Sequence, residues 1–196
     1  MSLLKLFGDA KFYHALERID AELAEATRRA RCPRCGGALH AGHYPRKPRG
    51  GPPDLAASYC TRASYCCGVD GCRKRATPPS VRFLARRVYL GAVVVLASAM
   101  QHGVSGFRAE QLKALFGVSR QTLERWRVWW LEMFPASRFW QSLCGRFAPA
   151  VDEGALPRSM LERFAPAADE PGGPAGAVLR LLQPISTRPW LEASAS

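Results

Sequence analysis

Two pairs of cysteines constrain the fold of this chain more than any other feature. Two residues separate Cys32 from Cys35, and four separate Cys67 from Cys72. Two cysteine turns that converge give the tetrahedral set of thiolates that structural Zn²⁺ prefers. The spacing therefore predicts a small β zinc ribbon in which Cys32, Cys35, Cys67 and Cys72 bind Zn²⁺. Four thiolates leave no open position for water, so we expect the metal to stabilise the fold rather than to catalyse a reaction.

The cysteine pattern leaves three alternatives open. Cys66 adjoins Cys67, and neighbours on a strand point to opposite faces, so only one of them can be the ligand; we choose Cys67, with Cys66 as its substitute. The segment 32–35 could be a thioredoxin-like redox pair, although no βαβ pattern surrounds it. His40 and His43 could complete a Cys₂His₂ site, although the gap after Cys35 is too short for the helix of a finger.

A second pattern, LKALFGVSRQTLERWRVWWLEMF, covers residues 112–134. It predicts a short helix over 108–116, a turn over 117–119 and a longer helix over 119–134, which is a helix-turn-helix arrangement. Gly117 suits a turn that needs positive φ, and the Ser119 hydroxyl can cap the second helix. Apolar residues fall where the two helices must lock together: Leu112, Phe116, Val118, Leu123 and Trp126. Lys113 departs from the pattern, which usually has a small residue there, and an ordinary helical hairpin is the alternative.

The basic residues indicate a polyphosphate partner. The net charge is +12, and residues 28–88 carry 14 basic and 2 acidic side chains. A concentrated basic surface is typical of nucleic-acid-binding proteins. On the second helix we expect contacts to base edges from Ser119, Arg120, Gln121, Glu124 and Arg125. For phosphate contacts we expect Arg73, Lys74, Arg75, Arg82, Arg86 and Arg87.

The remaining patterns predict a mainly α protein. Residues 9–30 form an amphipathic helix with Glu17, Asp20, Glu22 and Glu25 off its apolar face, and residues 81–102 form a long helix that completes a trihelical helix-turn-helix domain. We expect four regions. They are an N-terminal helix (1–30), a zinc-ribbon-like domain with a basic Pro/Gly loop (31–80), a helix-turn-helix domain (81–144) and a Pro/Ala-rich C-terminal tail with short helices (145–196).

No segment of the sequence predicts membrane insertion or secretion. The longest apolar run, residues 88–100, has thirteen residues, whereas a membrane-spanning helix needs about 20. No signal peptide is apparent at the N-terminus. We therefore expect a soluble, cytoplasmic, nucleoid-associated protein, in which cysteines bind metal rather than form disulfides.

Three segments carry a resemblance to a known family: CPRCGG (32–37), YCCGVDGCRKR (65–75) and LFGVSRQTLERWRVWW (115–130). Over about residues 30–135 the chain resembles the N-terminal region of bacterial insertion-element transposases and their orphan relatives. The resemblance implies that these modules grip DNA while a separate acidic domain cuts it. Beyond residue 150 the chain has six acidic residues, with no strand pattern to hold carboxylates around paired Mg²⁺.

The leading hypothesis is a transposase-like protein that binds double-stranded DNA sequence-selectively. It has no catalytic domain and is not an enzyme, and a separate transposase or nuclease subunit could supply catalysis. The alternatives are a transcriptional regulator of the helix-turn-helix type and a divergent transposase or nuclease. A protein-docking module built on the tryptophans, and RNA binding by the basic loop, are further candidates. The target sequence and the oligomeric state stay open.

Overall fold

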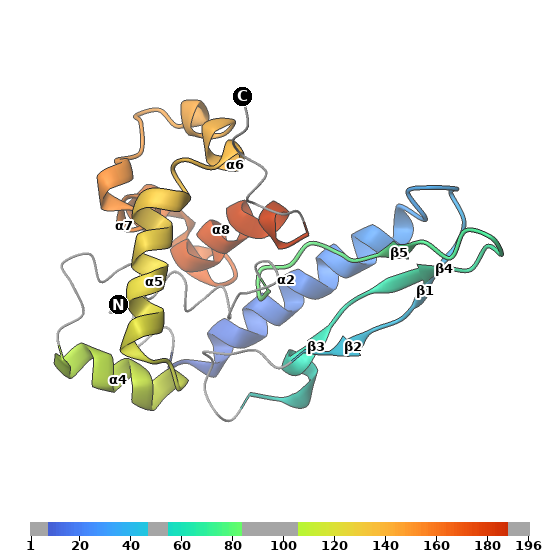
Figure 1. Ribbon diagram of the computed structural model, residues 1–196, viewed down its shortest axis with the longest axis horizontal. Helices are drawn as coiled ribbons and strands as arrows, with labels where there is room; N and C mark the ends of the chain where they lie inside the picture. The colour runs from blue at the N-terminus through green and yellow to red at the C-terminus, as the bar shows by residue number, and fades with distance from the viewer. Residues whose placement is uncertain (1–7, 47–54, 84–105, 188–196) are drawn as a thin grey trace.

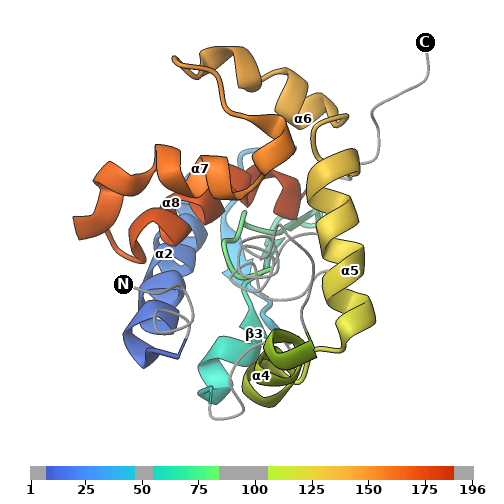
Figure 2. The same cartoon turned by 90° about the vertical axis from the view of Figure 1, so that its left-hand side faces the viewer.

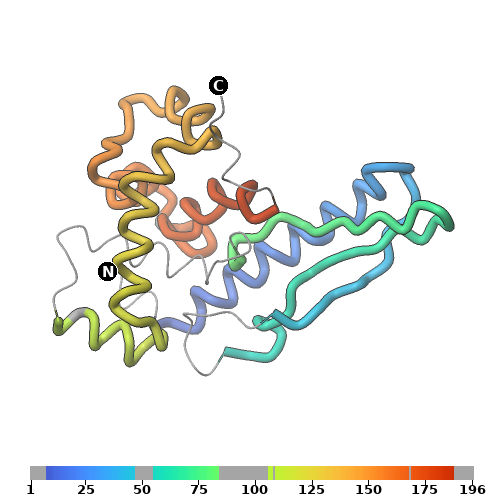
Figure 3. Tube along the Cα trace, viewed as in Figure 1, coloured from blue at the N-terminus to red at the C-terminus, as the bar shows by residue number. Residues whose placement is uncertain are grey.

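The structure is a computed structural model of the 196-residue chain, and it describes residues 8–46, 55–83 and 106–187. Two parts are evident in Figure 1: a helical head, formed by residues 106–187, and a narrow arm of short strands. A long helix, α2 (Ala10–Arg29), runs from the head along the arm. The tube in Figure 3 traces the arm as α2 and the strand segments lying side by side.

Helix α2 forms where the sequence predicts it. The Asp9 side chain caps its first turn by accepting a hydrogen bond from the Lys11 N–H at 2.9 Å, and Arg28 and Arg29 occupy its last turn, which suits the negative end of the helix dipole. Asp20 differs from the prediction, because it is 4% exposed. It follows Leu16 by four residues and therefore lies on the buried stripe of the helix.

The arm contains two small antiparallel sheets. Their strands are β1 (Leu39–Ala41), β2 (Tyr44–Pro45), β3 (Thr61–Arg62), β4 (Tyr65–Cys67) and β5 (Arg75–Ala76), and the 3-10 turn η1 (Ala57–Cys60) precedes β3. One sheet has the order β1-β4-β5, and β2 pairs with β3. The register sets Leu39 of β1 opposite Cys67 of β4. Because β1 follows Cys32 and Cys35 in the chain, this pairing brings Cys67 near the first cysteine pair.

The head consists of helices, and Figure 2 views it from the end opposite the arm. Its α-helices are α4 (Gly106–Phe116), α5 (Arg120–Val128), α6 (Arg138–Gln141), α7 (Arg158–Arg163) and α8 (Gly173–Leu182). Its shorter elements are η2 (Trp129–Met133), η3 (Cys144–Arg146), η4 (Glu153–Ala155), η5 (Ala165–Asp169) and η6 (Gln183–Ser186). A mainly helical fold with a small antiparallel sheet is therefore confirmed.

The C-terminal segment differs from the predicted tail. Met160, Leu179 and Leu182 are fully buried, in the same core as Leu16 of α2. The Pro/Gly segment over residues 171–174 starts a helix: Gly172, with φ of +83°, caps α8. The apolar residues of this segment lie in short helices between prolines. The composition of the segment therefore does not indicate that these helices pack into the core.

Part of the predicted helix-turn-helix domain lies outside the described residues. Val81–Phe83, where the long helix was expected to begin, is not helical, and residues 84–105, which include Arg86 and Arg87, are not described. The long helix expected over residues 81–102, and with it the trihelical domain, therefore stays a prediction. Among the helices within the described ranges, none has both the length and the apolar character needed to cross a membrane.

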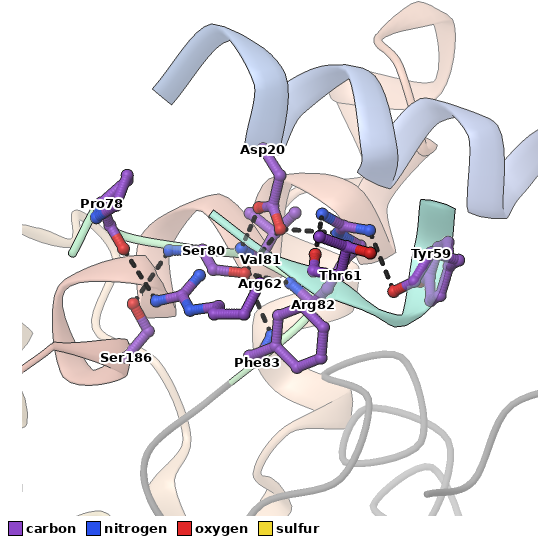
Figure 4. A network of polar contacts seen from close by, with 10 residues as sticks. All are labelled: Asp20, Tyr59, Thr61, Arg62, Pro78, Ser80, Val81, Arg82, Phe83 and Ser186. Atoms are coloured by element: carbon purple, nitrogen blue, oxygen red, sulfur yellow. Dashed lines mark hydrogen bonds and ion pairs between the residues drawn. The ribbon is translucent and has the colours of Figure 1, made fainter. Parts of the chain in front are cut away.

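A buried polar network joins the head to the arm (Figure 4). Asp20 accepts hydrogen bonds from Arg82 Nε and Ser80 Oγ, each at 2.6 Å, and from the Val81 N–H at 2.7 Å. The Ser80 N–H donates to Ser186 Oγ at 2.9 Å. The network thus connects α2, the segment after β5 and the C-terminal turn η6.

Arg82 is buried and paired within the protein. Its guanidinium pairs with Asp20 and also donates to the Tyr59 and Thr61 carbonyls, at 3.1 and 3.5 Å. The residue is 5% exposed. The prediction that Arg82 contacts DNA is therefore wrong, because a buried guanidinium with a buried carboxylate serves to hold the fold together.

Candidate metal centre and nucleic-acid interface

The structure brings Cys32, Cys35, Cys67 and Cys72 together at the tip of the arm. The Sγ atoms of Cys32 and Cys72 lie 3.7 Å apart, and those of Cys35 and Cys67 lie 3.5 Å apart. All four sulfurs lie within 4.8 Å of one another. Sulfurs about 2.3 Å from a tetrahedral ion would be separated by about 3.8 Å. The cluster can therefore hold a metal ion.

The first cysteine turn is closed by its own backbone. The Gly36 N–H donates to the Cys32 carbonyl at 2.8 Å, and the Cys32 N–H donates to the Gly37 carbonyl at 2.9 Å. Gly36 has φ of +70°, a conformation that costs glycine least. The turn directs Cys32 and Cys35 toward the same point.

The second turn reaches that point from β4. The Val69 N–H donates to Cys67 Sγ at 3.4 Å, and the Cys72 N–H donates to the Val69 carbonyl at 3.1 Å. Gly71, with φ of +80°, lets the chain reverse before Cys72. Although four residues separate Cys67 from Cys72, the turn between them brings the Cys72 thiol into the cluster.

Ionisation of the thiols is uneven. Backbone hydrogen bonds, chiefly from Arg34, lower the pKa of Cys32 to about 6. The Val69 N–H also lowers the pKa of Cys67, but desolvation and the neighbouring thiols outweigh it and raise that pKa to about 12. Four thiolates this close repel one another, so full ionisation requires a cation among them.

The structure decides among the alternative ligands. The Cys66 sulfur lies 3.5 Å from the Arg73 carbonyl and outside the cluster, so Cys67 is the member of the pair that belongs to the group able to hold a metal ion. His43 Nδ1 accepts a hydrogen bond from the Ser64 N–H at 3.1 Å. Neither His43 nor His40 belongs to the cluster, which argues against a Cys₂His₂ site.

Gly37 provides a test of the packing around the sulfurs. A Cβ at this position would lie 2.4 Å from Val69 Cγ2, 3.1 Å from Cys67 Sγ and 3.3 Å from Cys35 Sγ. Gly37→Ala should therefore weaken metal binding by about 1–3 kcal/mol, because fixed sulfurs cannot yield as a flexible side chain can. Competition with a chromophoric chelator measures this. Gly145→Ala, with nothing within 4 Å of the added carbon, is the control, and equal affinities for the two variants would contradict the assignment.

Helices α4 and α5 meet at the predicted turn. Gly117 has φ of +63°, and its N–H donates to the Lys113 carbonyl at 2.8 Å. Ser119 caps α5, accepting the Thr122 N–H at 3.3 Å. The residues expected to lock the two helices together are all buried: Leu112, Phe116, Val118, Leu123 and Trp126. The burial of these residues in α4, the turn and α5 thus agrees with the pattern over residues 112–134.

The residues expected to meet base edges are all exposed: Ser119, Arg120, Gln121, Glu124 and Arg125. Arg120 Nε pairs with Glu124 Oε1 at 2.9 Å, and an Arg125 N–H donates to Thr122 Oγ1 at 3.1 Å. Exposed pairs of this kind contribute little to stability. Both arginines can therefore exchange these partners for others.

The helix that begins at α5 continues to Phe134, as expected, but residues 129–133 form a π-helical turn. The Phe134 N–H donates to the Trp129 carbonyl at 2.7 Å. The rings of Trp129 and Trp130 lie 4.8 Å apart, and Trp130 is fully buried. The tryptophans of this segment therefore contribute mainly to the core.

Three of the predicted phosphate contacts lie on the arm near the metal centre. Arg73, Lys74 and Arg75 are exposed. Arg73 pairs with Asp70 at 2.8 Å, and the Arg75 guanidinium lies 6.0 Å from the centroid of the Tyr44 ring. Of the four predicted phosphate contacts that lie within the described residues, these three are accessible.

No protein-family model matches the chain, and neither the curated proteins nor the solved structures contain a match.

Proposed function

We propose that this protein binds double-stranded DNA sequence-selectively and that a structural Zn²⁺ ion organises its arm. The site consists of four cysteine sulfurs. Such a ligand set suits Zn²⁺ and leaves no position open for a substrate, so the metal would act on the fold. A transposase-like role, in which a separate subunit supplies the cutting chemistry, is part of the proposal.

The exposed N-terminal face of α5 carries this proposal. Its apolar residues are buried, whereas Arg120 and Gln121 in its first turn and Arg125 in its last turn are exposed. The major groove, about 12 Å wide, admits an α-helix. Arginine suits bidentate contacts to guanine, and glutamine suits adenine. The net charge of +12 favours approach to the duplex.

Selection from a random duplex library tests the proposal directly. The full-length protein should enrich a defined sequence, and a zinc chelator should weaken its binding because the arm loses its order. Failure to enrich any sequence would contradict sequence-selective binding. Enrichment unaffected by a chelator that demonstrably removes the metal would contradict the role of the ion.

Two substitutions separate base reading from phosphate binding. Arg120→Ala should reduce discrimination at one position of the selected site by about 1–3 kcal/mol, because it removes a base contact. Lys74→Ala should weaken binding to all sequences alike and reduce the salt slope by about one. Titration of matched and mismatched duplexes over a range of salt concentrations measures both effects. If the two variants behave identically, the assigned roles are wrong.

A further inference from the structure

Helix α2 belongs to both hydrophobic cores. Its first half contributes Phe12, Leu16 and Ile19 to the core of the head. Its second half contributes Ala24 to the small core of the arm, which also contains Leu39. One continuous helix therefore fixes the position of the arm relative to the head.

The arm and α5 lie at opposite ends of the molecule. Figure 1 shows α5 toward one end of the longest axis and β1, β4 and β5 toward the other, with α2 starting in the head and running alongside the strands of the arm. The 20 residues of α2 correspond to about 30 Å at 1.5 Å per residue. This length is close to one turn of B-DNA, about 34–36 Å.

Within the described residues, the exposed surface of the arm is mainly basic. Its exposed cations besides Arg73 are Arg28, Arg29, Arg31, Arg34, Lys74 and Arg75. Two of its carboxylates form ion pairs, Glu25 with Arg28 and Arg29, and Asp70 with Arg73, and Glu22 is a further exposed carboxylate on α2. The positive charge that these carboxylates do not neutralise is suited to binding the phosphates of a nucleic acid.

We propose that the protein contacts DNA at two places: α5 reads bases in the major groove, and the arm binds phosphates about one helical turn away along the duplex. This inference rests on the proposed function. The arm contributes affinity and the length of the binding site, but no sequence discrimination, because phosphate contacts carry no base information.

The Asp20–Arg82 pair keeps the two contact surfaces at a fixed separation. It ties α2 to the chain segment that leaves the arm, and Ser186 ties that segment to the head. A fixed separation lets the second contact form without the cost of ordering a flexible tether.

A cycle of duplex length and protein variant tests the proposal. The site selected by the full-length protein is placed either in a 30-base-pair duplex or in a short duplex that ends just beyond the bases protected by α5. Lys74→Gln/Arg75→Gln should weaken binding to the long duplex at least tenfold and reduce its salt slope by about two, since each neutralised phosphate contributes about 0.9. On the short duplex the variant and the wild type should bind equally. Arg146→Gln/Arg158→Gln, two exposed arginines of the head, removes the same charge and serves as the control.

Hydroxyl-radical footprinting supplies the second measurement. The wild type should protect two backbone patches about 10 base pairs apart, and the arm variant only the patch at the selected bases. A single continuous patch, or an equal effect of the variant on both duplexes, would overturn the two-contact proposal. Reading of bases by α5 would still be supported if chemical modification of bases in the selected site interfered with binding. If no base shows interference, the proposed function itself fails.

Discussion

Cys67→Ser is expected to cost the protein its metal ion and the folded state of its arm, whereas Cys66→Ser should leave both unchanged. The Cys67 sulfur lies 3.5 Å from that of Cys35 within the cluster, but the Cys66 sulfur faces the Arg73 carbonyl. Structural zinc sites contribute roughly 10–16 kcal/mol of apparent binding free energy, and that energy is also folding energy. Loss of one thiolate should therefore lower metal affinity by orders of magnitude.

Metal content by mass spectrometry and the visible absorption of the cobalt-substituted protein would measure this difference. A tetrahedral Co²⁺ site with four thiolates should give intense bands in the wild type and in Cys66→Ser, and weak or shifted bands in Cys67→Ser. The two adjacent cysteines make a matched pair of variants. Equal loss from both would mean that the assignment of Cys67 as the ligand is wrong.

Asp20→Ala is expected to destabilise the protein by about 3–5 kcal/mol, because it leaves a buried guanidinium without its counter-charge. Asp20 and Arg82 are 4% and 5% exposed, and their side chains lie 2.6 Å apart. The substitution also removes the acceptor for Ser80 Oγ and the Val81 N–H. A loss of this size is a large part of the stability of a small protein.

Urea denaturation followed by far-ultraviolet circular dichroism would measure the change in the free energy of unfolding. Glu22→Ala is the control, since Glu22 is an exposed carboxylate on the same helix; its effect should stay within about 0.5 kcal/mol. An Asp20→Ala protein as stable as Glu22→Ala would show that the network does not hold the head and the arm together.

The cluster of four cysteines could be predicted from the sequence because it depends on spacing within short turns. Cys32 and Cys35 come with the glycine that lets their turn close. Strand parity allowed only one of Cys66 and Cys67 in the cluster, and the structure places Cys67 there. The α4–α5 turn was predictable for the same reason, since Gly117 and Ser119 act on their immediate neighbours.

The Asp20–Arg82 pair was not predicted, because its partners are 62 residues apart. Each was assigned by its charge alone, Asp20 to a solvated face and Arg82 to a phosphate. The position of Asp20 four residues after Leu16 was the available signal. The C-terminal layer was missed for a related reason: Met160 and Leu182 belong to short helices whose burial depends on α2, far away in the chain.

The shared helix has a consequence for how the molecule opens. Ile19 belongs to the core of the head and Ala24 to that of the arm, only five residues later. The central turn of α2 packs against both cores. Its backbone amide hydrogens are therefore expected to exchange with solvent only after both the core of the head and the core of the arm have opened. Loss of the metal would then fray the far end of the helix first, and the slowest-exchanging amides of α2 would remain on the head side of residue 20.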